Sequence, residues 1–178
     1  SAAGAGCRPV LRRLPVFAST LTTAGASMYP WRWITAPGLA VQAAWSDGSR
    51  VSFSGTSGSA PVVSGAIATI LSQNPELTPA QAWQVLQTHA SEAGRPGTDA
   101  DYGNGVLNLG WALARKNPVR ADTAVASHYY SATNEQLQIV LQNRSATAVA
   151  GLDLNIEING SLQHAPVSWL AAGATTIV

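Results

Sequence analysis

The run from Gly55 to Gly65 (GTSGSAPVVSG) constrains the fold of this chain more than any other segment. It surrounds Ser57 with small residues and leads into an apolar stretch that ends at Gln73. Apolar residues in that stretch lie on every side of a helical projection, and this pattern predicts a helix over residues 59–73 that is buried all round. We therefore expect the Ser57 hydroxyl at the start of a buried helix, facing an open cleft.

Two interpretations of Ser57 follow from this placement. A serine that precedes a helix is most often an N-cap, whose hydroxyl accepts a bond from the first turn. The alternative is a nucleophile, because small neighbours leave room for a substrate backbone. The free N–H groups and the positive dipole end of a helix N-terminus also stabilise an oxyanion.

The composition limits the classes of function. Of the 178 residues, 46% are hydrophobic and 11% are charged, and the net charge is +1. This balance excludes a disordered tail and indicates neither a nucleic-acid nor an anionic-membrane partner. No apolar stretch is long enough to span a bilayer. Cys7 is the one cysteine, so no internal disulfide and no Cys/His metal set are predicted.

The first half of the chain alternates short apolar segments with glycine and proline. Strands are predicted over residues 16–22, 31–35 and 39–45, with a turn over residues 46–49. Thr78, Pro79 and Gln81 form a capping-box pattern that predicts the start of a second helix. His89 falls on the apolar face of that helix. Residues 102–114 predict a glycine turn followed by a short helix.

After Pro118 the pattern becomes that of β-structure. Leu152, Leu154, Ile156 and Ile158 alternate with polar residues, which predicts a half-buried strand. Asn159-Gly160 predicts a hairpin turn, and residues 175–178 predict a further strand. We therefore predict two domains, residues 1–118 and residues 119–178.

Four segments, in order, resemble the subtilisin-like serine protease family. Gly55, Thr56, Ser57, Pro61 and Gly65 fall on its nucleophile pattern G-T-S-x-x-x-P-x-x-x-G. The other three are the segment ending in Ala-Pro-Gly (residues 34–38), the capped helix (residues 75–88) and the turn Y-G-x-G-x-x-N (residues 102–108). The resemblance implies an α/β fold in which residues 1–118 are the C-terminal part of a doubly wound parallel sheet. Residues 119–178 resemble part of an immunoglobulin-like module, a short antiparallel β-sandwich.

The resemblance also implies site residues. Ser57 would be the catalytic nucleophile, and its backbone N–H would donate to the oxyanion. Ala5 stands at the position where the family usually has the asparagine that donates to the same oxyanion. The substrate backbone would bind along Ala2, Ala3, Gly4, Ala36, Pro37 and Gly38. No cofactor is indicated, and no residues can be assigned to a structural calcium ion.

The chain departs from the family at the other two catalytic residues. The family places an aspartate and then a histidine before the serine, yet no histidine precedes Ser57 and the one acid before it is Asp47, in a turn. His89, His128 and His164 lie downstream and lack the family motif. A serine without a neighbouring base is a weak nucleophile, so we expect this chain alone to be nearly inactive.

Three functions remain open at this stage. The first is a secreted bacterial-type endopeptidase, extracellular, periplasmic or at the cell surface, that cleaves polypeptides. Its aspartate and histidine would come from the N-terminal part of the protease domain, as a removed or separate segment. The second is a catalytically dead pseudoprotease that binds peptides or partners. The third is an adhesion module whose β region contacts glycans, although no aromatic cluster with paired carboxylates supports it.

Overall fold

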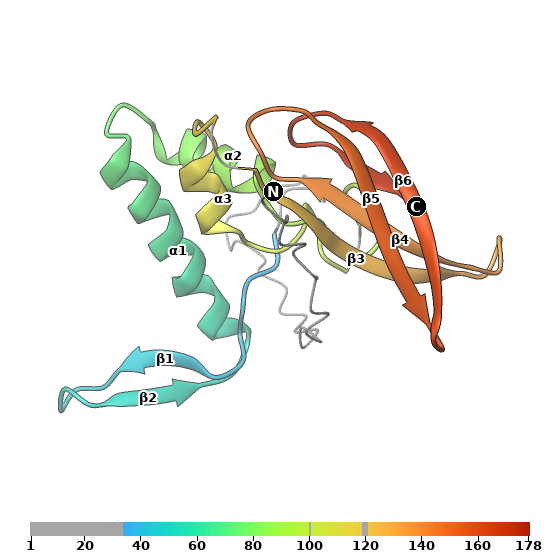
Figure 1. Cartoon of the computed structure of the whole chain (residues 1–178). Coiled ribbons are helices and arrows are strands. Elements are labelled where there is room, and N and C mark those ends of the chain that lie inside the picture. The colour runs from blue at the N-terminus through green and yellow to red at the C-terminus, as the bar shows by residue number, and fades with distance from the viewer. Residues whose placement is uncertain (1–33, 100, 119–120) are drawn as a thin grey trace, which may run out of the picture.

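The computed structural model describes residues 34–99, 101–118 and 121–178 (Figure 1). These residues form a mixed α/β arrangement with a helical part, residues 34–116, and a β part, residues 121–178. The elements in chain order are β1 (Val41–Ala44), β2 (Arg50–Phe53), α1 (Thr56–Gln73), α2 (Pro79–Thr88), α3 (Leu109–Ala114), β3 (Thr123–Ser131), β4 (Gln136–Asn143), β5 (Val149–Ile158), β6 (Ser161–Leu170) and β7 (Thr175–Ile177). The predicted division into two domains stays a prediction.

The sheets of the described residues are small and antiparallel: β1–β2, β3–β4–β7 and β5–β6. No parallel sheet occurs in this part of the chain, although Thr35 and Val106 form an isolated parallel bridge. The loops of the three hairpins are short, and parallel neighbours would need crossovers of a dozen or more residues. The doubly wound parallel sheet implied by the resemblance is therefore not formed by the described residues.

The first predicted strands are only partly tested. Residues 16–22 and 31–33 lie outside the described residues, and Ile34 and Thr35 form isolated bridges rather than a strand. The strand predicted over residues 39–45 is the shorter β1, which pairs with β2 in a hairpin. In its turn the Asp47 carboxylate accepts a 2.8 Å bond from the Ser49 N–H, and bonds from Ser49 lower the pKa of Asp47. This hairpin projects from the body of the molecule (Figure 1).

Helix α1 begins earlier than predicted and is buried on one side only. Its N-cap is Gly55, so the helix starts at Thr56 and includes Ser57 in its first turn. Val63, Ala66 and Ile70 are buried, and they face α2 and α3. The opposite side, which includes Ser64 and Gly65, is exposed. The prediction of burial all round was wrong for the described structure, because no described element covers that second side.

Helix α2 confirms the predicted capping box. The Thr78 hydroxyl accepts a 3.3 Å bond from the Gln81 N–H, and the Gln81 side chain accepts a 2.8 Å bond from the Thr78 N–H. Pro79 occupies the first helical position, where a missing N–H costs nothing. Ala82 and Leu86 are buried on the face that packs against α1 and α3.

The β part consists of two antiparallel layers. Leu152, Leu154 and Ile156 alternate with exposed residues along β5, which confirms the predicted half-buried strand, while Ile158 is exposed. Asn159 and Gly160 form the predicted hairpin turn, with φ of 51° and 78°. The β5–β6 hairpin packs on the β3–β4–β7 sheet through Leu141, Val167, Leu170 and their partly buried neighbours.

Candidate nucleophile site

Ser57 is the second residue of α1, and its side chain is exposed. Gly55 holds the N-cap position with φ of 142° and offers no side chain, so the serine is not used as a cap. The Ser57 side chain makes no hydrogen bond to any other residue that the structure describes. Of the two interpretations of this serine, the capping interpretation is therefore wrong, and the hydroxyl is free to contact another molecule.

Backbone groups of the first turn of α1 are also free. The Gly58 N–H donates a 2.9 Å bond to the Gly55 carbonyl, whereas the Ser57 N–H has no intrahelical acceptor. Pro61 lies four residues after Ser57 and has no N–H, so the usual helical donor to the Ser57 carbonyl is missing. The turn therefore presents an N–H and the positive dipole end beside the hydroxyl. This combination suits a developing negative charge.

The segment from Ala36 to Gly38 lies directly beside this turn, as the resemblance implied. The Gly55 N–H donates a 2.7 Å bond to the Gly38 carbonyl, and the Ser59 hydroxyl donates a 3.1 Å bond to the Ala36 carbonyl. Pro37 is exposed, but Ala36 is fully buried within the core of the helical part. The Ala36 side chain therefore supports the site from beneath. The assignment of Ala36, Pro37 and Gly38 to substrate binding stays a prediction.

The first turn of α1 is also braced by the β1–β2 hairpin. A Cβ atom at Gly58 would lie 3.0 Å from Cδ1 of Phe53 and 3.8 Å from Cγ2 of Val41. The absence of a side chain at Gly58 therefore lets the Phe53 ring pack against the turn that carries Ser57. Sequence reasoning missed Ser59, Phe53 and Gly58 as supports. The signal available in the sequence was the pair of small residues Gly58 and Ser59 directly after Ser57, since small residues in a helix allow close packing.

The turn from Tyr102 to Asn108 joins the site from the other side of the Ala36 segment. The Thr35 N–H donates a 2.8 Å bond to the Gly105 carbonyl, and the Leu107 N–H donates a 2.7 Å bond to the Thr35 carbonyl. Asn108 caps α3 by accepting a 2.9 Å bond from the Trp111 N–H. The structure thus brings together three of the sequence segments that the resemblance singled out.

The histidines of the chain do not join Ser57. His89 packs edge-on against Trp111 with ring centroids 5.1 Å apart, and its Nδ1–H donates a 2.8 Å bond to the Val85 carbonyl. Burial lowers the pKa of His89 and so favours its neutral form. His128 lies exposed on β3. Within the described residues, Ser57 therefore has no general base beside it.

The one described pair of a histidine with a carboxylate lies in the β part. His164 Nδ1 is 3.3 Å from Asp153 Oδ2 on the β5–β6 hairpin, and more than half of each side chain is exposed. Figure 1 shows this hairpin on the side of the molecule away from the start of α1. The pair therefore does not serve Ser57 in this structure.

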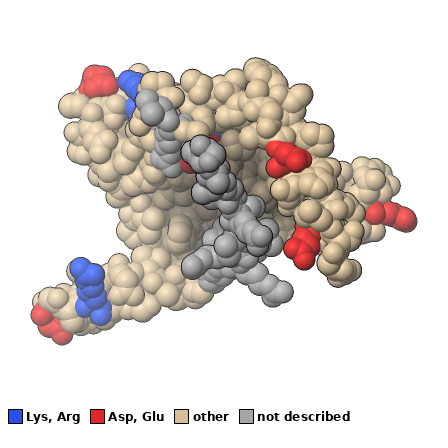
Figure 2. All heavy atoms as spheres, in the orientation of Figure 1, with Lys and Arg blue, Asp and Glu red and all other residues tan. Residues whose placement is uncertain are grey.

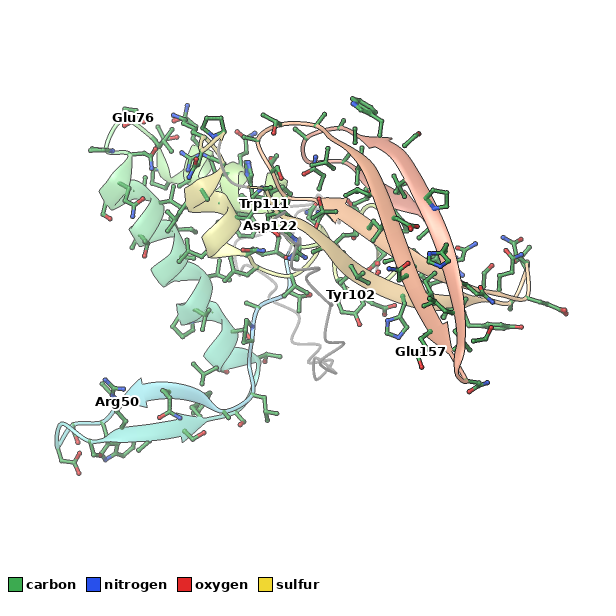
Figure 3. All side chains as sticks on the ribbon, in the orientation of Figure 1. Arg50, Glu76, Tyr102, Trp111, Asp122 and Glu157 are labelled. Atoms are coloured by element: carbon green, nitrogen blue, oxygen red, sulfur yellow. The ribbon has the colours of Figure 1, made fainter. Side chains whose placement is uncertain are left out.

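The remaining expectations concern charge, metals and membranes. Figure 2 shows few charged residues on this face, with no large patch of one sign. Figure 3 places Arg50 on the projecting hairpin and Glu157 at the far end of the β part. Among the residues described, no group of three or more His, Cys, Asp or Glu side chains is arranged to hold a metal ion, and no helix is long and apolar enough to cross a membrane. Ala2, Ala3, Gly4, Ala5 and Cys7 lie outside the described residues.

Known proteins resemble part of this chain. Subtilisin from Bacillus pumilus is 36% identical over 76 residues, which make up 43% of this chain and 26% of that subtilisin. The chain thus spans about a quarter of the length of the curated relative that it matches. The family model that matches residues 18–105 is described as the subtilase family, and the matched range contains Ser57 and the segments beside it. Residues 18–105 therefore match the subtilase family, and the chain is similar to a subtilisin over 76 residues.

Proposed function

We propose that Ser57 is the nucleophile of a serine endopeptidase, and that the helical part supplies only the nucleophile-bearing portion of its active site. The observation that carries the proposal is the exposed hydroxyl in the first turn of α1, whose capping role is taken by Gly55. The match of residues 18–105 to the subtilase family supports the same assignment. A serine with no structural partner, at a helix N-terminus, suits acyl transfer.

In this reaction Ser57 Oγ attacks a peptide carbonyl carbon while its proton passes to a histidine. The tetrahedral oxyanion is stabilised by the Ser57 N–H. The carbon–nitrogen bond then breaks, and the amine leaves with the proton returned by the histidine. Water finally hydrolyses the acyl-serine ester in the same manner. The histidine and its orienting aspartate come from a polypeptide segment outside this chain, since no histidine precedes Ser57 in its sequence.

The substrate in this proposal is an extended polypeptide. It passes over the exposed Pro37 and the first turn of α1, since these residues adjoin Ser57. The low content of charged residues, with abundant small polar ones, favours a secreted, extracellular, periplasmic or cell-surface protein. Without the histidine the rate is expected to be lower by about 10⁶-fold, the loss found when a subtilisin lacks that residue.

A fluorophosphonate probe tests the proposal, because it phosphonylates only activated serines. The protein is incubated with the probe alone and together with a polypeptide that carries the aspartate and histidine segments of a subtilase. We expect mass to be added at Ser57 only in the second case. Ser57→Ala should abolish labelling, and Ser64→Ala, which removes an exposed serine of the same helix, should retain it.

Absence of labelling at Ser57 would contradict its assignment as a nucleophile. If Ser57 stays unlabelled under both conditions while circular dichroism shows an intact fold, the nucleophile proposal fails. If that unreactive protein still binds peptides, the result would favour the pseudoprotease alternative.

A further inference from the structure

The β part is joined to the helical part by a buried glutamine. Gln142, on β4, is 5% exposed. Its Oε1 accepts bonds from the Glu92 N–H at 3.0 Å and from Arg144 Nε at 3.2 Å, and its Nε2 donates a 3.2 Å bond to the Ala90 carbonyl. The amide therefore binds the backbone on both sides of Ser91, in the loop that follows α2. Buried polar groups held in this way are costly to disrupt.

Neighbouring residues on the same face of the sheet strengthen this junction. Ser127 and Tyr129 on β3 lie opposite Val140 and Gln138 of β4, so all of them share a face with Gln142. The Ser127 hydroxyl donates a 2.6 Å bond to the Gly94 carbonyl, and the Arg95 guanidinium lies 5.9 Å from the centre of the Tyr129 ring. Gln142, Ser127 and Tyr129 thus contact the loop after α2 from one face of the β3–β4 pair.

Backbone bonds lead from that loop toward Ser57. Ser91 and Val106 exchange two bonds, of 2.8 and 2.7 Å. The residues on either side of Val106 bond to Thr35 at 2.8 and 2.7 Å. The next residue along, Ala36, accepts the bond from the buried Ser59 hydroxyl in the first turn of α1. The backbone steps are 2.7 or 2.8 Å long and the Ser59 bond is 3.1 Å, so the set forms a continuous ladder of hydrogen bonds from Gln142 to the turn that carries Ser57.

We propose that Gln142 is a positioning residue, which fixes the Ser57 turn from the β part through this ladder. The β part is then a structural support of the nucleophile site rather than a detachable accessory. The mechanical coupling stands whether or not Ser57 is catalytic, and only its effect on reactivity rests on the proposed function. Loss of the Gln142 bonds should release the loop after α2 first, and then the segments that pair with it.

Hydrogen exchange on the full chain tests the coupling. Gln142→Met keeps the length of the side chain and removes its hydrogen bonds. Gln138→Met is the matched control, since Gln138 lies on the same face of β4 and its side chain makes no hydrogen bond to a described residue. We expect Gln142→Met to speed exchange by about tenfold in residues 90–93, 104–108 and 34–38, and Gln138→Met to leave it unchanged. Faster exchange confined to residues 90–93 would overturn the proposal.

If Gln142→Met does not fold, hydrogen exchange of the wild-type protein tests the coupling instead. In that event the amides of Val106 and Leu107 should exchange with the same dependence on denaturant as those of Val140 and Leu141, as expected for one cooperative unit. Exchange of the first pair at low denaturant, well before the second pair, would overturn the proposal.

The rate of Ser57 phosphonylation tests whether the Gln142 bonds affect the reactivity of the serine. With the complementing subtilase segment present, Gln142→Met should lower the maximal rate of Ser57 phosphonylation by about tenfold while the probe concentration at half-maximal rate stays constant. An unchanged maximal rate would refute the positioning role. If the wild-type serine is never labelled, the proposed function fails while hydrogen exchange still decides the coupling.

Discussion

The Ser59 hydroxyl donates a 3.1 Å hydrogen bond to the Ala36 carbonyl, and both residues are fully buried. Ser57 lies two positions earlier in the same turn. Because successive residues of an α-helix are separated by about 100°, positions two apart point to nearly opposite sides. The buried bond of Ser59 thereby directs Ser57 outward, which explains how an apolar helix presents the Ser57 hydroxyl to solvent.

Ser59→Ala should lower the free energy of unfolding by about 1–2 kcal/mol, because it removes a buried hydrogen bond to a carbonyl. Ser64→Ala is the matched control, since the exposed Ser64 hydroxyl bonds to the Ala60 carbonyl of its own helix. That control should change stability by less than about 0.5 kcal/mol. Urea unfolding followed by circular dichroism measures both. Equal effects of the two substitutions would contradict the role given to Ser59.

Alanine substitutions at the two glycines of α1, Gly58 and Gly65, should have different effects on stability. Alanine at the exposed Gly65, where nothing lies within 4 Å of a Cβ, should stabilise the protein by about 0.5–1 kcal/mol. At Gly58 the added methyl group meets the Phe53 ring, so we expect that gain to vanish. Phe53→Leu in the Gly58→Ala background should restore it. If both glycine substitutions stabilise equally in thermal melts, the Phe53 contact does not brace the turn.

How far the sequence predicts the site depends on whether the information is local. The Thr78–Gln81 capping box and the Asn159–Gly160 turn are encoded by adjacent residues, and the structure has both. The start of α1 was misplaced because small residues such as Gly58 carry little pattern of their own. Gly55 ends the extended segment with a φ of 142°, a backbone conformation that the sequence alone does not show.

The remaining differences come from long-range contacts. Burial of α1 was predicted from the apolar pattern of the helix alone, yet exposure is decided by what packs against each side, and only one side is covered by described elements. The Gln142 junction joins residues about 50 positions apart. A lone glutamine in a strand gives no sign of such a partner.

Gly105→Ala should be among the most damaging single substitutions in the helical part. Gly105 has φ of 109°, and a Cβ there would overlap the Ser91 carbonyl oxygen, which accepts a bond from Val106. Gly97 has a similar φ of 95° but open space around it. Gly97→Ala should therefore cost about 1–2 kcal/mol from backbone strain alone. Gly105→Ala should cost at least about 1–3 kcal/mol more, measured by urea unfolding, and similar losses at the two positions would contradict the close approach.

Stability should fall as the pH drops through the range in which His89 titrates in the unfolded chain. Burial is the main cause that lowers the pKa of His89 from its ordinary value of 6.5, and the positive charge of Arg115 adds to it. The unfolded state then binds the proton more readily than the folded state, so the contribution of His89 is complete above pH 6.5 and is lost on acidification. Glu92 acts in the opposite sense, since burial raises its pKa from 4.5 and its ionisation costs stability as the pH rises.

His89→Gln isolates the histidine contribution. Urea unfolding of the wild type at about pH 7.5 and about pH 5.5 should show lower stability at the acidic value. The glutamine variant should lose that difference and show the opposite slope of Glu92. The double variant with Glu92→Gln should then flatten the remaining slope. An unchanged acid loss in His89→Gln would mean that another group controls the pH dependence, and that burial of the ring against Trp111 does not oppose its protonation.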